Sequence, residues 1–197
     1  LQIIPHYFMN SVLPILTISL KEGGDRATRI IRYALNALAA HAFPIFIGGY
    51  LLAWPLTVAV SNPEFLTQRL TDGTLVYGSD FALKILLIAM SFTYLHVALS
   101  YTLVAIGKQS ELFWINGVVV VVNAVLNFIL VPRLGFIGAA VSAVASEIVM
   151  FALLVIRVRK RVRNIWHFAF LGKTIFSSLV MGAFIMLFSD YFNNALG

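Results

Sequence analysis

The chain has 197 residues, of which 60% are hydrophobic and only 11% are charged, and its formal net charge is +6. Soluble globular domains carry about 25% charged residues, so this chain has too little polar surface to be one. It contains no cysteine, which excludes disulfides, thiol chemistry and metal sites built on cysteine. The composition therefore predicts an integral membrane protein.

Six apolar segments are long enough to cross a bilayer, whose hydrocarbon core of about 30 Å needs roughly 20 helical residues. In chain order, the predicted spans are residues 1–20, 33–60, 81–106, 113–132, 135–156 and 168–191. The first two spans contain prolines, which are expected to kink them because proline removes a backbone hydrogen bond. The sequence thus predicts an all-α membrane protein with six transmembrane helices.

The chain begins at Leu1, within the first apolar segment. No charged region precedes this segment and no typical cleavage site follows it, so it does not resemble a signal peptide. We therefore expect the chain to be part of a longer protein that continues before Leu1.

Basic residues predict the orientation, because cytoplasmic loops of membrane proteins are enriched in Lys and Arg. The connections after the first, third and fifth spans hold most of the 14 basic residues: Lys21, Arg26, Arg29, Arg32, Lys108, Arg157, Arg159, Lys160, Arg161 and Arg163. The opposite connections hold only Arg69 and Arg133. This asymmetry predicts that the three basic connections are cytoplasmic and that both chain ends lie outside.

Two connections carry helix-start signals. Asp25 is expected to cap a short amphipathic helix that lies on the inner membrane surface and carries Arg26, Arg29 and Arg32. On the outer side, Ser79 or Asp80 is expected to cap the third span. The basic run 157–163 directly follows a membrane helix, which favours anionic lipid headgroups over nucleic acid as its partner.

The fourth and fifth spans are joined by only two residues, Arg133 and Leu134, which predicts a tight antiparallel hairpin. Lipid supplies no hydrophobic force between helices, so close backbone contact between small residues has to hold them together. Small residues are frequent on the fifth span: Gly135, Gly138, Ala139, Ala140, Ser142, Ala143, Ala145 and Ser146. Asn123 and Asn127 share one face of the fourth span and can form hydrogen bonds across the hairpin.

An ordered series of motifs resembles a known family. The series is Asn123-x3-Asn127, then Leu130-Val-Pro132-Arg-Leu-Gly135, then Ile137-Gly138-Ala139-Ala140 and Ser146-Glu147, preceded by Ala105-Ile-Gly107-Lys108. It is similar to the polysaccharide flippases, the O-antigen and exopolysaccharide translocators of the multidrug/oligosaccharidyl-lipid/polysaccharide exporter superfamily. The resemblance covers roughly residues 1–157.

The resemblance implies a MATE-like fold with 12 to 14 helices in two lobes around a central cavity. Residues 1–197 would form a single lobe, the C-terminal one, with spans matching helices eight to thirteen, and the N-terminal lobe is absent from this chain. The family implies alternating access around a site near the membrane midplane. The implied partners are membrane lipids, the missing lobe and a polyprenyl-pyrophosphate-linked oligosaccharide, which is flipped across the cytoplasmic membrane for surface polysaccharide synthesis.

Three titratable residues lie inside predicted spans. Glu147 is near mid-membrane, where an acid costs about 2.5–3.5 kcal/mol on insertion scales and should face protein or a wet cavity. It is either an ion-coupling residue or a packing contact with a neighbouring helix. His41 and His96 are either proton relays or neutral side chains that are hydrogen-bonded to a neighbour.

Candidate substrate-binding residues lie in the first two spans and in the basic connection between them. Arg26, Arg29 and Arg32 suit a pyrophosphate, because guanidinium groups match phosphate geometry. Binding of lipid headgroups and a role in setting the topology are the favoured alternative. Asn10 and Asn36 either line a cavity or join helices.

No motif of a catalytic, nucleotide or metal site occurs in the sequence. We therefore expect a transporter that is not an enzyme and uses no cofactor or metal.

One alternative is a cation-coupled multidrug exporter of the same fold, which acidic residues in the first span would favour; that span has none. Another is a membrane enzyme acting on the same lipid carrier, for which the outer loop 61–80 carries few reactive side chains. A structural membrane subunit is the third.

Overall fold

The computed structural model describes residues 2–22, 25–69, 75–162 and 168–196. Its elements are α1 (Ile3–Glu22), α2 (Arg26–Leu51), α3 (Ala53–Val60), a 3-10 turn η1 (Pro63–Phe65), β1 (Gln68–Arg69), β2 (Leu75–Val76), α4 (Ser79–Ala105), α5 (Gln109–Leu134), α6 (Phe136–Arg159) and α7 (Phe168–Leu196). Six of the helices, α1, α2, α4, α5, α6 and α7, are long and apolar enough to cross a membrane. The prediction of an all-α, multi-pass membrane protein with six spans is confirmed.

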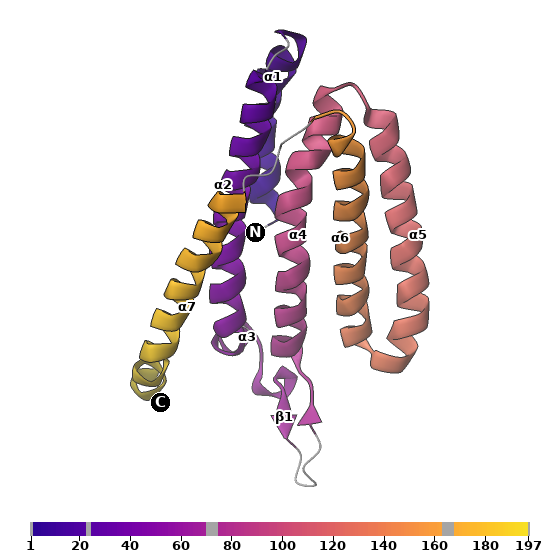
Figure 1. Ribbon diagram of the computed structural model, residues 1–197. Coiled ribbons are helices and arrows are strands. Elements are labelled where there is room, and N and C mark those ends of the chain that lie inside the picture. Colours follow the sequence, from indigo (N-terminus) through magenta and orange to yellow (C-terminus); the bar gives the residue numbers. More distant parts are fainter. Residues whose placement is uncertain (1, 23–24, 70–74, 163–167, 197) are drawn as a thin grey trace.

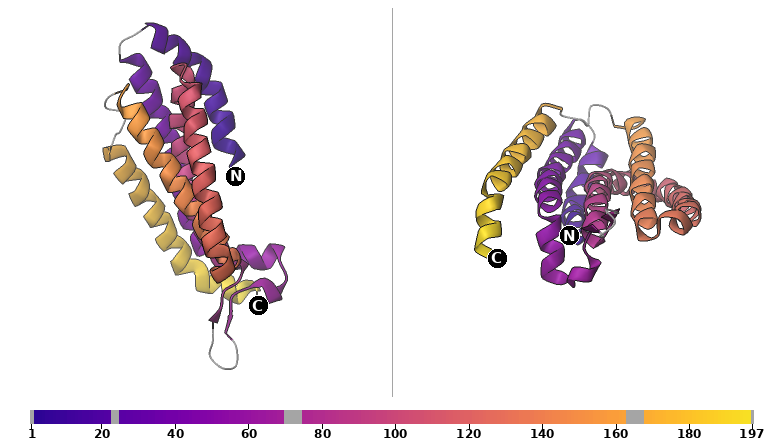
Figure 2. Two further views of the ribbon diagram at one scale, coloured as in Figure 1. Left: turned by 90° about the vertical axis from the view of Figure 1, so that its right-hand side faces the viewer. Right: turned by 90° about the horizontal axis from the view of Figure 1, so that it is seen from below.

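The helices form one bundle in which α4 is central (Figures 1 and 2). It packs against α1, α2 and α6, while α7 packs on the far side of α2 and α5 on the far side of α6. Large apolar side chains of α4 fill the core, including the fully buried Tyr94, Leu99 and Leu103. The long helices α4 and α6 run in the same direction, with α5 antiparallel between them in the chain.

The basic connection after α1 does not form a separate surface helix. Arg26, Arg29 and Arg32 belong to the first two turns of α2, which continues without a break to Leu51. The prediction of a separate short helix was wrong, because apolar residues such as Ile31 are buried against the bundle and extend the membrane helix toward the water. Asp25 is the N-cap residue, but its side chain makes no capping hydrogen bond.

The second predicted span consists of two helices that meet at Leu52. Pro55 in α3 lacks the N–H group that would bond to the carbonyl group of Leu51, so a continuous helix loses a hydrogen bond at this point. The short α3 then leads to the segment that reaches the β1–β2 hairpin (Figure 1).

A small hairpin lies at the end of the bundle opposite the basic connections. Its strands pair antiparallel, with Gln68 opposite Val76 and Arg69 opposite Leu75. The start of α4 also differs from the prediction, because Gly78 rather than Ser79 or Asp80 occupies the N-cap position. Asp80 instead accepts hydrogen bonds from Thr67 N (2.8 Å) and Thr67 Oγ1 (2.7 Å), which fixes the hairpin to α4.

The turn between α5 and α6 is shorter than predicted. Arg133 and Leu134 still belong to α5, and the single residue Gly135 joins the two helices. Gly135 has φ of +57°, a backbone conformation that glycine adopts at no steric cost.

Candidate functional site

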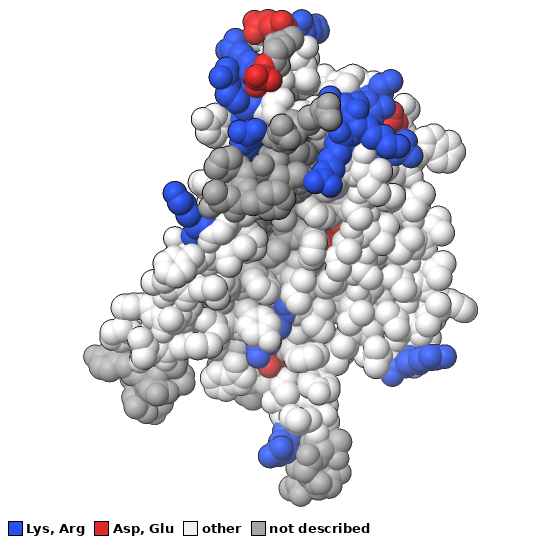
Figure 3. Space-filling model, viewed as in Figure 1, with Lys and Arg blue, Asp and Glu red and all other residues white. Residues whose placement is uncertain are grey.

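Basic side chains gather at one end of the bundle, over the α1–α2 connection and the neighbouring ends of α4, α5 and α6 (Figure 3). Arg26 forms an ion pair with Glu22 at 3.0 Å, and both side chains are more than half exposed. Arg29 is exposed and Arg32 is half-buried. The three arginines predicted to meet phosphate therefore lie on successive turns of α2 at the basic end of the bundle.

A second basic group lies at the same end, between the start of α5 and the end of α6. Glu111 contacts Arg161 (3.0 Å, Arg161 Nη1 to Glu111 Oε2) and Arg157 (3.8 Å). These contacts join α5 to α6 on the cytoplasmic side predicted from the loop charges. Arg163, the last residue of the basic run 157–163, lies outside the described residues.

Two hollows of about 330 Å³ and 520 Å³ open on the bundle, and both are lined by apolar side chains together with a few polar ones. The larger lies between α1 and α4 and is lined by Gln2, Ile3, His6, Tyr7, Asn10 and Thr93. Asn10 is exposed there and its Oδ1 accepts a hydrogen bond of 2.9 Å from the hydroxyl group of Tyr101 in α4. The smaller lies between α2 and α7 and is lined by residues including Lys173, Thr174 and Ser178.

The two asparagines of the first spans differ in their surroundings. Asn10 joins α1 to α4 and also lines the larger hollow, so it combines the two roles that the sequence allowed. Asn36 is half-buried on α2 and does not line either hollow.

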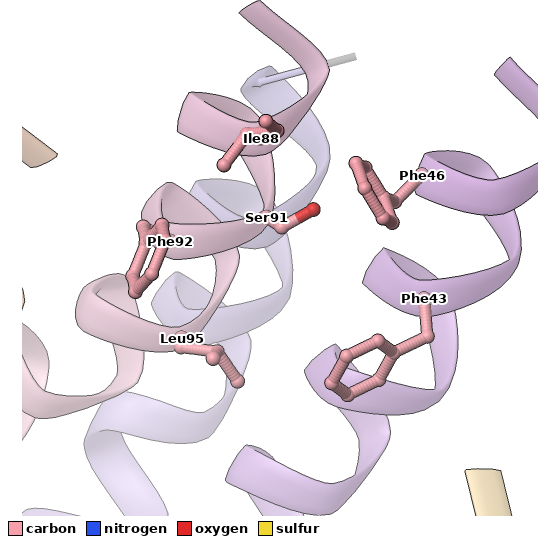
Figure 4. A pocket seen from close by; sticks show the side chains of 6 residues that line it. All are labelled: Phe43, Phe46, Ile88, Ser91, Phe92 and Leu95. Atoms are coloured by element: carbon pink, nitrogen blue, oxygen red, sulfur yellow. The ribbon is translucent and has the colours of Figure 1, made fainter. Parts of the chain in front are cut away.

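An apolar groove of about 250 Å³ separates α2 from α4 (Figure 4). Its walls are Phe43 and Phe46 of α2 and Ile88, Ser91, Phe92 and Leu95 of α4. The Ser91 hydroxyl group lies at this gap and donates to the carbonyl oxygen of Leu87 at 3.0 Å.

The three titratable residues predicted inside the spans occupy two places. His41 is exposed on α2 and stacks on the buried ring of Tyr94, with centroids 6.3 Å apart and planes 11° from parallel. His96 of α4 and Glu147 of α6 meet each other, with 2.7 Å between Nε2 and Oε2. The structure thus brings His96 and Glu147 together and leaves His41 with an aromatic neighbour.

The α5–α6 hairpin packs at backbone contact. A Cβ atom on Gly138 would lie 2.5 Å from the carbonyl oxygen of Leu130, and Ala140 is buried while Ala139 and Pro132 are exposed. Asn123 Nδ2 donates to Ser146 Oγ across the hairpin (3.0 Å), and Asn127 Nδ2 donates to Asn123 Oδ1 (2.9 Å).

Sequence reasoning missed Tyr94, which stacks on His41, Tyr101, which donates to Asn10, and Thr93, which lines the hollow beside Asn10. Tyr94 and Tyr101 are seven residues apart and therefore lie on nearly the same face of a helix. Two tyrosines at that spacing in an apolar span were a usable signal, because a buried tyrosine hydroxyl group needs a partner.

Comparison with known proteins identifies the fold. No family model and no curated protein matches the chain. Among solved structures, it is similar to the lipid II flippase MurJ in its inward closed conformation, with a TM-score of 0.69 and 18% identity.

The similarity covers 94% of this chain and 38% of the MurJ chain. At this identity it shows the fold alone. The chain has a fold similar to part of the MurJ chain, and it spans well under half the length of this structural neighbour.

Proposed function

We propose that this chain is one lobe of a flippase for a lipid-linked oligosaccharide in the cytoplasmic membrane. The observation that carries the proposal is that its bundle superposes on the lipid II flippase MurJ over 94% of its length. A lobe of this kind works with a second lobe, because alternating access needs two bodies that rock around a shared site. The 38% coverage of MurJ supports the proposal that the N-terminal lobe lies outside this chain.

The proposed substrate is a polyprenyl-pyrophosphate-linked oligosaccharide used for cell-surface polysaccharide. Arg26, Arg29 and Arg32 support this, because they present guanidinium groups at the end of the bundle where a cytoplasmic substrate would enter. Guanidinium groups bind phosphate oxygens through paired, charge-assisted hydrogen bonds. The hydroxyl-rich sugar would then pass along polar side chains such as Asn10 and Tyr101, which line or border the α1–α4 hollow.

The proposed reaction is movement of the headgroup from the inner to the outer leaflet, without covalent chemistry. The role is that of a transporter, in which binding and conformational change move the substrate. Lipid headgroups are expected to bind the basic group formed by Arg157, Arg159 and Arg161.

The test uses the full-length native protein in proteoliposomes that contain a polyprenyl-pyrophosphate oligosaccharide with a fluorescent headgroup. A membrane-impermeant reductant quenches only outward-facing headgroups, so a flippase raises the quenched fraction over time. The expected result is flipping by the native protein and slower flipping by Arg29→Ala. Arg133→Ala, at the opposite end of the bundle, is the matched control and should flip at the native rate. No flipping above that of empty vesicles would contradict the proposal.

A multidrug exporter of the same fold is the second candidate, and the groove in Figure 4 favours it. Phe43, Phe46 and Phe92 line this groove, and aromatic faces attract organic cations. The same vesicles can therefore be loaded with a fluorescent organic cation. Export of the cation without headgroup flipping would select this candidate over the first.

A further inference from the structure

One acid–base pair joins two long helices in the interior of the bundle. Glu147 lies at the middle of α6 and contacts His96 of α4, with 2.7 Å between Glu147 Oε2 and His96 Nε2. Only 12% of the His96 side chain and 26% of the Glu147 side chain are exposed. The other ion pairs among the described residues lie at the basic end of the bundle.

Apolar rings lie beside this pair. Phe92, one turn before His96, contacts Phe151, one turn after Glu147, with ring centroids 5.8 Å apart at 63°. Met150 and Leu154 of α6 are buried nearby on the same helix. The pair therefore lies in surroundings of low polarity, where an isolated charge is strongly disfavoured.

The other titratable groups on the helices packed around the pair have different neighbours. On α2, His41 stacks on Tyr94, and on α1, His6 lies near the ring of Tyr101. On α5, Glu111 contacts Arg157 of α6 and Arg161, two residues after the end of α6. On α4 itself, Lys84 lies over the ring of Tyr50.

The rest of these helices adds charge only near their ends. The groups are Lys21 and Glu22 of α1, the arginines in the first two turns of α2, Asp80 of α4, Arg133 of α5 and Arg159 of α6, while α3 has no titratable side chain. Among the described residues, His96 and Glu147 have no ion-pair partner except each other.

The contact between the pair is close but is not aligned as a hydrogen bond. Glu147 Oε2 is buried without a hydrogen-bond donor, and His96 Nδ1 is buried without a partner among the described residues. The two atoms are within ion-pair distance at 2.7 Å, and the histidine is charged there only when it is protonated. In an apolar interior the favoured state of such a pair is the one with no net charge, in which histidine and glutamate together hold one exchangeable proton.

We propose that His96 and Glu147 form a proton-binding site inside the membrane and that its occupancy controls the packing of α4 against α6. With the proton bound, the pair is neutral overall and draws the helices together. When the proton leaves to water, an uncompensated carboxylate remains in the interior and favours separation of the helices or entry of water. The proton is exchanged with solvent, and no bond other than N–H or O–H forms or breaks.

This site has a mechanical consequence for the lobe. The α5–α6 hairpin contacts the rest of the described bundle mainly through α6 against α4. A change in the α4–α6 contact therefore changes how the hairpin is held. Protonation of this site therefore sets the rate at which the lobe moves during transport, an inference that rests on the proposed function.

The first experiment measures protonation without transport. Infrared difference spectra of the full-length protein in nanodiscs are recorded between acidic and neutral pH. We expect a carboxyl band that is lost in Glu147→Gln, is kept in Glu111→Gln and is altered in His96→Gln. Glu111 is the matched control, because it also contacts basic side chains but lies at the basic end of the bundle. A Glu147 band that is unchanged by His96→Gln would overturn the proposal.

The second experiment measures flipping with and without a pH gradient, in the vesicles described above. The native protein and Glu111→Gln should respond severalfold to the gradient, while His96→Gln and Glu147→Gln should lose the response. The exchanged pair, His96→Glu with Glu147→His, should regain it, which separates a proton site from damage to folding. An equal response of Glu147→Gln and the native protein would overturn the proposal.

The two experiments separate this inference from the proposed function. If the native protein flips no lipid-linked headgroup, the proposed function fails, and the infrared result alone decides whether the pair binds a proton. If the native protein flips the lipid-linked headgroup at a rate that does not depend on the pH gradient, the inference that this site controls transport is wrong, while the flippase proposal stands.

Discussion

Gly138 in α6 lies directly against Leu130 in α5: a Cβ atom on Gly138 would be 2.5 Å from the carbonyl oxygen and 2.6 Å from the carbonyl carbon of Leu130. Backbone atoms cannot move aside as a flexible side chain can. The two helices are therefore packed at a distance that only glycine permits at this position. In a membrane, where burial of apolar surface gives no advantage over lipid, such close contact is a main source of helix association.

The first prediction concerns this glycine. Gly138→Ala should destabilise the folded protein by about 1–3 kcal/mol, as overpacking does in a tight core, and Gly138→Leu should prevent accumulation of folded protein. Unfolding of the purified variants in detergent measures the first effect, and size-exclusion chromatography the second.

The control for this prediction is Gly117→Ala in α5, where nothing lies within 4 Å of the added Cβ atom. Alanine there should be neutral or slightly stabilising, because glycine weakens a helix interior by about 1 kcal/mol relative to alanine. Equal losses for the two substitutions would show that the close approach at Gly138 is not what stabilises the hairpin.

The second prediction concerns the polar contact across the same hairpin. Asn123→Ala removes the bond to Ser146 and also the acceptor used by Asn127. Hydrogen bonds between membrane helices contribute about 0.6 kcal/mol on average and at most about 1.7 kcal/mol, so the expected loss lies in that range. Unfolding in detergent measures it. Asn116→Ala is the control, since Asn116 donates to Leu112 within its own helix, and a matching loss there would contradict the assignment.

The length of the apolar segments was enough to locate the six spans, because uninterrupted apolar segments as long as a bilayer is thick are typical of transmembrane helices. The hairpin was also accessible, since glycine, alanine and serine gather on one side of a very short turn. The details at helix ends were not accessible. Asp25 and Asp80 both belong to a residue type that commonly caps helices. Asp80 instead binds Thr67, which lies 13 residues earlier in the chain, and no local sequence pattern predicts such a contact.

The site was predicted only as separate residues. Glu147 and His96 each stood out as polar groups in apolar spans, yet their contact depends on α4 and α6 being parallel neighbours. That arrangement follows from how α5 returns along α6, which one sequence without its three-dimensional packing does not reveal. The spacing of Tyr94 and Tyr101 could have marked them as candidates, but their partners His41 and Asn10 follow only from the packing of α4 against α2 and α1.

The third prediction concerns the β1–β2 hairpin, which the loop charges predict to lie on the outer side. Asp80→Ala removes two hydrogen bonds that hold Thr67, whose hydroxyl group also accepts from Gly78 N at 2.8 Å. The hairpin should become more accessible to protease. Limited proteolysis of right-side-out vesicles, in which the added protease reaches the side predicted to be outside, should therefore cut this segment severalfold faster. Glu64→Ala, an exposed acid in the same outer segment, serves as the control. Equal cleavage of Asp80→Ala and the native protein would show that this contact does not hold the hairpin.

The fourth prediction concerns orientation. Because the chain has no cysteine, single cysteines introduced into it can report on each side of the membrane. Gln68→Cys in the outer hairpin should react with a membrane-impermeant maleimide added to intact cells, and Lys108→Cys between α4 and α5 should react only after permeabilisation. Both positions are exposed. The reverse labelling pattern would invert the orientation predicted from the loop charges.

The single-residue turn at Gly135 bears on how the protein enters the bilayer. Gly135, with φ at +57°, is the single residue between α5, which ends at Leu134, and α6. The connection is therefore too short to stay in water after one of the two helices has inserted into the membrane. We therefore infer that α5 and α6 partition into the membrane together, as a preformed pair leaving the insertion machinery in one step. In the orientation predicted from the loop charges, Arg133 is carried across with them, so the biogenesis of this segment would include the transfer of a guanidinium group through the hydrocarbon layer.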